Sequence, residues 1–135
     1  MKKSFKTVLA FLTVCAITFY LNSCKDKEHS APAVYFNSTI PYIYDDTTLT
    51  AGTTFAIYVQ ANEEGVNDLL ESGQISVSIN GGPDSVIQTM SFVSDVFNQG
   101  YAYKAGATGT YAKFVFTFAT QSGVAGSDSL ILHYN

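Results

Sequence analysis

The sequence contains no arginine and no tryptophan, and it has only two histidines and two cysteines. Arginine supplies the bidentate guanidinium contacts that dominate nucleic-acid sites, so its absence argues against a nucleic-acid partner. Both cysteines, Cys15 and Cys24, lie near the N-terminus. A disulfide framework and a zinc–cysteine site are therefore excluded for the rest of the chain, because each needs thiols that it lacks.

Acidic residues are absent from the N-terminal segment and abundant after it. The first 23 of the 135 residues carry three of the seven lysines and none of the eleven acids, which leaves four lysines against eleven acids, a formal net charge of −7. From His29 onward only Lys104 and Lys113 stand against nine acids. About 100 residues of foldable chain suit one domain, and the sequence predicts that this domain is acidic.

The N-terminus has the pattern of a processing signal. Lys2, Lys3 and Lys6 precede an uncharged apolar run at residues 7–21, which is shorter than the roughly 20 residues of a membrane-spanning helix. This pattern predicts a secretory signal peptide at residues 1–23. The run ends in Leu21-Asn22-Ser23-Cys24, which resembles a bacterial lipobox. The resemblance implies that Cys24 is lipidated and anchors the protein to a membrane; the alternative is an incidental thiol beside a cleaved leader.

A short charged run, Lys25-Asp26-Lys27-Glu28, follows Cys24. It resembles, with a mixture of charges, the acid-rich signal that exports Bacteroidetes lipoproteins to the outer face of the outer membrane. The resemblance implies a lipid-anchored protein of the outer membrane, exposed at the cell surface, whereas a plain solvated spacer is the alternative. We expect residues 24–33 to form a lipidated tether and residues 34–135 to form the folded domain.

Alternation of apolar and polar residues predicts an all-β domain. Short β-branched and aromatic runs are broken every eight to twelve positions by Gly, Asn, Asp or Pro, which is the spacing of an antiparallel β-sandwich. Three segments alternate clearly and four weaker strands lie at 34–36, 86–92, 96–104 and 129–134, about seven strands in all. The residues expected in the core are Phe55, Ile57, Val59, Ile75, Val77, Ile79, Phe114, Phe116 and Phe118. Ser76, Ser78 and Asn80 are expected on a solvated face.

Turn residues agree with this division. Asn80-Gly81-Gly82-Pro83-Asp84 predicts a turn between neighbouring strands, and residues 67–73 predict a crossover turn rather than a packed helix. Three features follow one another along the chain: Ala51-Gly52-Thr53-Thr54-Phe55 before an alternating strand, a phenylalanine-rich strand with a glycine-containing loop, and a short final strand. Together they resemble the small immunoglobulin-like surface lipoproteins of Bacteroidetes. The resemblance covers about residues 34–134. It implies an immunoglobulin-like β-sandwich at the cell surface and assigns no catalytic or ligand-binding residue.

Sites for chemistry are sparse. His29 lies in the tether and His133 in the final strand, and no nucleophile elbow, metalloprotease helix, phosphate loop or dinucleotide fingerprint occurs. Adjacent carboxylates in extended chain point oppositely, which does not suit a paired-carboxylate mechanism. Calcium ligands in loops are an alternative for Asp45, Asp46, Glu63, Glu64 and Asp68, but no calcium-loop motif is present and solvated surface charge is favoured. We therefore predict no catalytic residue, no cofactor and no metal site.

Tyrosines offer candidate contact residues. Tyr42 and Tyr44, and likewise Tyr101 and Tyr103, lie two positions apart and so point to one side of an extended segment. These four side chains are candidates for contact with a protein or glycan partner, and core packing is the alternative. The sequence predicts a non-enzymatic interaction module at the cell surface; a structural accessory subunit of an outer-membrane complex is the alternative.

Three tripeptides, Asp46-Thr47-Thr48, Asp84-Ser85-Val86 and Asp128-Ser129-Leu130, resemble the O-glycosylation motif of secreted Bacteroidetes proteins. The resemblance implies glycosylation at Thr47, Ser85 and Ser129. Each of these positions is expected at a turn or at the edge of a strand.

Overall fold

The computed structural model describes residues 29–65 and 67–135. The predicted signal peptide at residues 1–23, the lipidation site Cys24 and the charged run 25–28 lie outside the described residues. Within the described ranges the chain forms strands and turns, and no helix there is long and apolar enough to cross a membrane. The strands are β1 (Ala33–Phe36), β2 (Thr47–Leu49), β3 (Thr54–Asn62), β4 (Leu70–Ile79), β5 (Ser85–Ser94), β6 (Val96–Lys104), β7 (Tyr111–Thr120) and β8 (Ala125–Tyr134).

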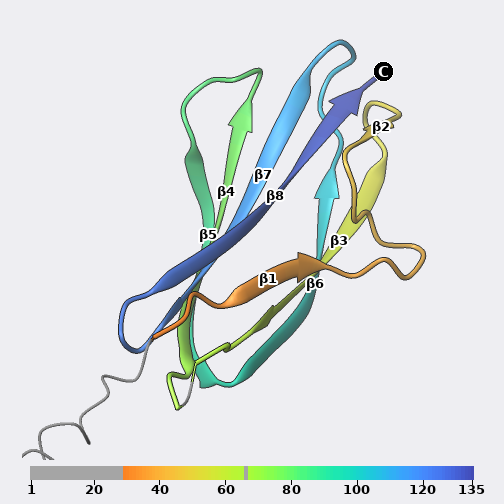
Figure 1. The fold of residues 1–135 in the computed structure, drawn as a ribbon. Coiled ribbons are helices and arrows are strands. Elements are labelled where there is room, and N and C mark those ends of the chain that lie inside the picture. The colour runs from red at the N-terminus through yellow and green to blue at the C-terminus, as the bar shows by residue number, and fades with distance from the viewer. Residues whose placement is uncertain (1–28, 66) are drawn as a thin grey trace, which may run out of the picture.

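The strands form two packed sheets (Figure 1). The smaller sheet has the order β1-β3-β6 and the larger has the order β2-β8-β7-β4-β5. All pairs are antiparallel except β2 with β8. The predicted fold class, an immunoglobulin-like β-sandwich, is confirmed.

One strand, β2, was not expected. Its residues Thr47–Leu49 are too few to show alternation, and they pair in parallel with the end of β8, which lies more than eighty residues away in sequence. The backbone N–H of Ile131 donates a hydrogen bond of 2.7 Å to Oδ1 of Asp46, immediately before β2. This long-range pairing has no local signature, so the described part of the chain has eight strands rather than about seven.

The inner faces of the two sheets form the core. Seven of the nine predicted core residues are buried, and Val77 is half-buried against them. The exception is Ile79, which is 51 % exposed because it is the last residue of β4 and adjoins the exposed 80–84 turn. Rings from both sheets meet inside, for example Phe36 against Phe116 with ring centroids 5.4 Å apart. The alternation of the sequence therefore identified the inward faces except at a strand end.

The expectation that Ser76 and Ser78 lie on a solvated face is wrong. They do point outward, opposite Val115 and Lys113 of β7, but only 8 % and 6 % of their surfaces are exposed. Their side chains are short, and longer side chains on adjacent strands can cover them. The Ser78 hydroxyl donates a hydrogen bond of 2.6 Å to the carbonyl oxygen of Gly82.

Turns fall where the sequence predicted them. Asn80 and Gly81 have positive φ angles of 49° and 72° in the connection from β4 to β5, a conformation that glycine and asparagine adopt most easily. The predicted crossover turn is confined to the residues before Leu70, because β4 already begins there. β1 begins at Ala33, one residue before the predicted start of the domain.

Candidate functional site

The structure places Tyr101 and Tyr103 on the inner face of β6, so the prediction that they contact a partner is wrong. They pair in register with Ile57 and Phe55, whose side chains are in the core. Tyr101 is 8 % exposed, and its hydroxyl donates to Sδ of Met90 at 2.7 Å. Spacing correctly put the two tyrosines on one side of the strand, but that side faces the opposite sheet.

The Tyr103 hydroxyl is a buried polar group. It is shielded from solvent, and no protein group among the described residues forms a hydrogen bond with it. Burial, with a smaller contribution from Tyr101, raises the pKa of Tyr103 to about 12. Its ring packs between Phe55 and Phe114 at centroid distances of 5.9 and 4.8 Å, so packing holds this side chain in place.

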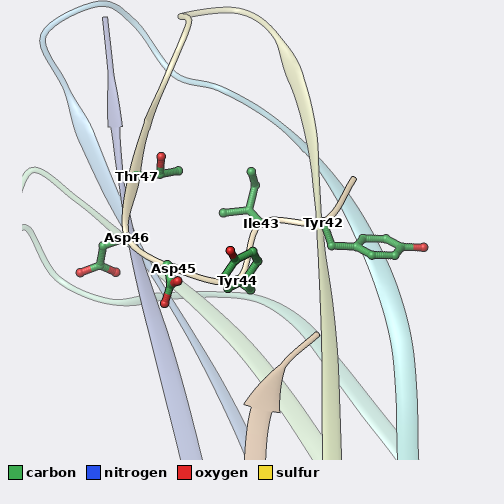
Figure 2. Close-up of a pocket in the computed structure, with 6 residues that line it drawn as sticks. All are labelled: Tyr42, Ile43, Tyr44, Asp45, Asp46 and Thr47. Atoms are coloured by element: carbon green, nitrogen blue, oxygen red, sulfur yellow. The ribbon is translucent and has the colours of Figure 1, made fainter. Parts of the chain in front are cut away.

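Tyr42 and Tyr44 lie on the segment that links β1 to β2. Backbone N–H groups of Asn37 and Ile43 donate to carbonyl oxygens of Tyr58 and Ala56 in β3, at 2.9 and 2.8 Å, and so fasten this segment to the smaller sheet. Tyr42 points away from the acidic residues of the segment (Figure 2) and packs on Tyr58, with ring centroids 5.0 Å apart. Tyr44 is 44 % exposed. Both residues line a small hollow in this segment, although the Tyr42 ring also packs on β3.

Two hollows of about 190 and 410 Å³ share Tyr44, Asp45 and Asp46 in their walls. Asp128 of β8 also lines the larger one. Two of the three carboxylates here bind backbone N–H groups: Asp46 accepts from Ile131 N–H, and Asp128 Oδ1 accepts from Ser129 N–H at 2.8 Å. Within residues 29–65 and 67–135, no group of three or more histidine, cysteine or acidic side chains is arranged to hold a metal ion.

The acidic residues considered as calcium ligands are dispersed. Glu63 follows β3, and its backbone N–H donates to the Asp95 carbonyl oxygen at 2.9 Å. Asp68 lies in a separate cluster, described next. The structure thus does not bring these residues together with Asp45 and Asp46.

Asp68 is the centre of a hydrogen-bonded cluster that the sequence did not predict. It is 3 % exposed, and its carboxylate accepts from the Ser122 hydroxyl at 2.5 Å and the Ser122 N–H at 3.0 Å. Nδ1 of His29 lies 3.0 Å from the same carboxylate, and Thr120 Oγ1 lies 3.0 Å from the Ser122 hydroxyl. The pKa of Asp68 is lowered to about 2, chiefly by the hydrogen bond from the Ser122 hydroxyl, although burial acts in the opposite direction. Hydrogen bonds from Thr120, the Ser122 N–H and His29 lower it further.

A serine, a histidine and an aspartate meet here in the wrong order for nucleophilic catalysis. A nucleophile needs a hydrogen bond to its base, with the carboxylate behind the base. Here the carboxylate lies between Ser122 and His29, and each of them contacts it separately. The geometry supports a clamp that joins the start of the domain to the loops at one end of the sandwich.

That clamp shortens the predicted tether. His29 and Pro32, expected within the 24–33 tether, both contact the domain. Pro32 is buried, and its carbonyl oxygen lies so close to Gly126 that a side chain there would overlap with it. Residues 29–33 therefore belong to the domain.

The predicted O-glycosylation residues lie in three different settings. Ser85 is exposed at the start of β5, where Asp84 precedes it in an exposed turn. Thr47 is half-buried in β2, and Ser129 is half-buried in β8. Ser85 is therefore the most accessible of the three hydroxyls.

The sequence matches no known protein family and no curated protein. Among solved structures it is similar to Spo0M, a sporulation control protein from Bacillus subtilis, with a TM-score of 0.49 and 7 % identity over 79 % of this chain. The chain spans about half of that protein, 49 %. It is also similar to a CARDB domain from Pyrococcus furiosus that was solved with two metal ions, with a TM-score of 0.45 and 9 % identity; the match covers 80 % of this chain and 97 % of that domain.

Proposed function

We propose that this protein is a lipid-anchored outer-membrane protein exposed at the cell surface, and that its sandwich is a non-enzymatic interaction module for a protein or glycan partner. The proposed location is supported by the lipobox-like Leu21-Asn22-Ser23-Cys24 and by the charged run that follows it. With a clamp at His29, only four residues separate Cys24 from the domain, so the sandwich would lie close to the membrane.

The observation that supports an interaction role is the exposed segment between β1 and β2. Ile40 is 88 % exposed and Tyr44 is 44 % exposed, yet the backbone around them is hydrogen-bonded to β3. Exposed apolar and aromatic side chains on a backbone that is fixed by hydrogen bonds are suited to contact a partner, because little conformational entropy is lost on binding.

A second apolar patch favours the accessory-subunit alternative. Ile79, Val86 and Ile87 are each about half exposed around the β4–β5 connection. β5 is also an edge strand of the larger sheet. Exposed apolar side chains on an edge strand are suited to a permanent neighbour that covers them.

Lipidation is tested by feeding cells a fatty-acid probe. We expect the wild-type protein and a Cys15→Ala control to carry label and Cys24→Ala to lose it. Label retained in Cys24→Ala would contradict the anchor. Protease treatment of intact cells then tests exposure, because a protein that survives until lysis does not face the medium.

The interaction role is tested with photo-crosslinking residues placed one at a time at positions 40, 44 and 86 of the full chain in intact cells. A single protein adduct at these positions would support a protein partner. An adduct only from position 86 would favour the accessory-subunit alternative. If no position gives an adduct and no polysaccharide binds, the interaction role is wrong.

A further inference from the structure

The outer face of the smaller sheet differs in composition from the rest of the domain. Strand alternation and register place one set of side chains on this side, and Tyr42 lies over it from the segment after β1. We call this surface the tyrosine–amide face, and its residues are Tyr35, Tyr42, Tyr58, Gln60, Asn62 and Asn98. Resting on the proposed function, we propose that this face binds a neutral polysaccharide.

Amide side chains form polar pairs across the strands. Gln60 Nε2 donates to Asn98 Oδ1 at 2.7 Å, and Asn62 Nδ2 donates to the Tyr35 hydroxyl at 3.0 Å, both at the surface. Each amide has two N–H donors and an oxygen with two lone pairs, so these bonds use only part of its capacity. Hydroxyl groups of a sugar act as both donors and acceptors, and they match a surface that offers both.

Aromatic rings lie beside these amides. Tyr35 is opposite Gln60, which is opposite Asn98, so a ring and two amides form one row across the three strands. The next outward-facing row pairs Tyr58 with Gly100, one strand repeat of roughly 7 Å away.

Gly100 lies beside an aromatic pair. A side-chain carbon at Gly100 would lie 3.4 Å from Tyr58 and 3.5 Å from Tyr42, so this exposed glycine is bordered by both rings. The rings are inclined by 52°, and the pair thus presents ring surface in two orientations. Apolar C–H faces of sugar rings pack on such surfaces while their hydroxyls reach the amides.

Charge favours a neutral ligand over an anionic one. Lys104 is the only charged side chain among the outward positions of β1, β3 and β6, at the far end from the amides. The domain from His29 onward nevertheless carries nine acids against two lysines. An anionic polysaccharide would meet a repulsive field, whereas a neutral one would not.

Composition also favours a glycan over a protein at this face. The centre of a protein interface is rich in large apolar side chains, and charged and polar ones are displaced to its rim. Here the centre is amide, and the alanines Ala56 and Ala102 occupy the row beyond Tyr58. The exposed aliphatic residues Ile40, Val86 and Ile87 lie elsewhere. On this face the exposed aliphatic side chain is Val96, which lies opposite Asn62 at one end of the strands and not at the centre.

The test uses the full-length protein in detergent, run on native gels that contain mannan, dextran, xylan or a soluble β-glucan, with polygalacturonate as the anionic comparison. We expect at least one neutral polysaccharide to retard the protein and polygalacturonate not to. Tyr58→Ala and Asn98→Ala should each weaken binding about tenfold, which corresponds to about 1.4 kcal/mol. Tyr111→Ala, a half-exposed tyrosine on the larger sheet, should bind as the wild type does.

Asn98→Ala is the decisive variant if Tyr58→Ala fails to fold, because Asn98 is exposed and outside the core. Unchanged binding in Asn98→Ala and in a folded Tyr58→Ala overturns the site. No retardation by any of the four neutral polysaccharides overturns the ligand class. In that event a protein adduct from a photo-crosslinker at position 98 leaves the proposed interaction role standing, whereas no adduct at 40, 44 or 98 removes that role as well.

Discussion

Replacing Tyr103 by phenylalanine is expected to stabilise the domain, which is the opposite of the usual effect of deleting a buried hydroxyl. The hydroxyl is shielded from solvent, and no described protein group is placed to bond it. A buried polar group without a partner costs about 1–3 kcal/mol, and Tyr103→Phe removes that cost. A small void left in place of the oxygen offsets part of the gain. We therefore expect a net gain of about 1 kcal/mol in the free energy of unfolding.

Tyr101→Phe is the matched comparison, because the two tyrosines lie two residues apart on one face of β6. The Tyr101 hydroxyl donates to the Met90 sulfur, so its removal should cost about 0.5–1.5 kcal/mol. The assay is urea unfolding followed by circular dichroism, supported by thermal melts in which 1 kcal/mol corresponds to roughly 4–8 °C. If Tyr103→Phe is as destabilising as Tyr101→Phe, the Tyr103 hydroxyl has a partner and the reasoning is refuted.

The same burial predicts a pH effect at the alkaline end. The pKa of folded Tyr103 is about 12, above its ordinary 10.0, so the neutral form is favoured in the folded state. Ionisation of this group therefore does not affect stability below about pH 10, and the folded state loses stability as the pH rises from 10 toward 12, because the phenol ionises more easily in the unfolded chain. Tyr103→Phe should be less sensitive to alkaline unfolding than the wild type; an identical alkaline profile would contradict the assignment.

Three further predictions concern the core, the Asp68 cluster and the outer face of β4. Phe116→Ala should lower the free energy of unfolding in urea by about 3–5 kcal/mol, because this ring is fully buried. Val115→Ala, on the outer side of the same strand, should lower it by about 1 kcal/mol. Equal losses would mean that the faces of β7 are misassigned. The pKa of Asp68 is about 2, below its ordinary 3.8, so its contribution to the free energy of unfolding is present above about pH 4 and is lost as the pH falls toward 2. Asp68→Asn should therefore unfold more easily at neutral pH, and its stability should depend less on acid than that of the wild type. An unchanged acid profile would contradict this. Ser78→Ala should cost about 1 kcal/mol, since it leaves the Gly82 carbonyl without its donor, and a neutral result would show that water replaces the hydroxyl.

The sequence by itself determined the fold class and the inward faces of most strands. A strand position that faces the core must be apolar, whereas the next position along the strand can be polar. The alternation at residues 55–59 and 114–118 therefore predicts which side chains are buried. The turn at Asn80-Gly81 is equally local, because its positive φ angles restrict the residue types there. Such features are legible in sequence because their causes lie within a few residues.

Only the tertiary structure decided which side chains are available for function. Tyr42 and Tyr101 look alike in sequence, each followed by a second tyrosine two residues later, but one lies on an outer face and the other in the core. The pairing of β2 with β8, the meeting of His29, Asp68 and Ser122, and the row of Tyr35, Gln60 and Asn98 all join residues that are far apart in the chain. Local pattern carries no information about such contacts, because strand register and sheet order are set by the packing of the whole domain.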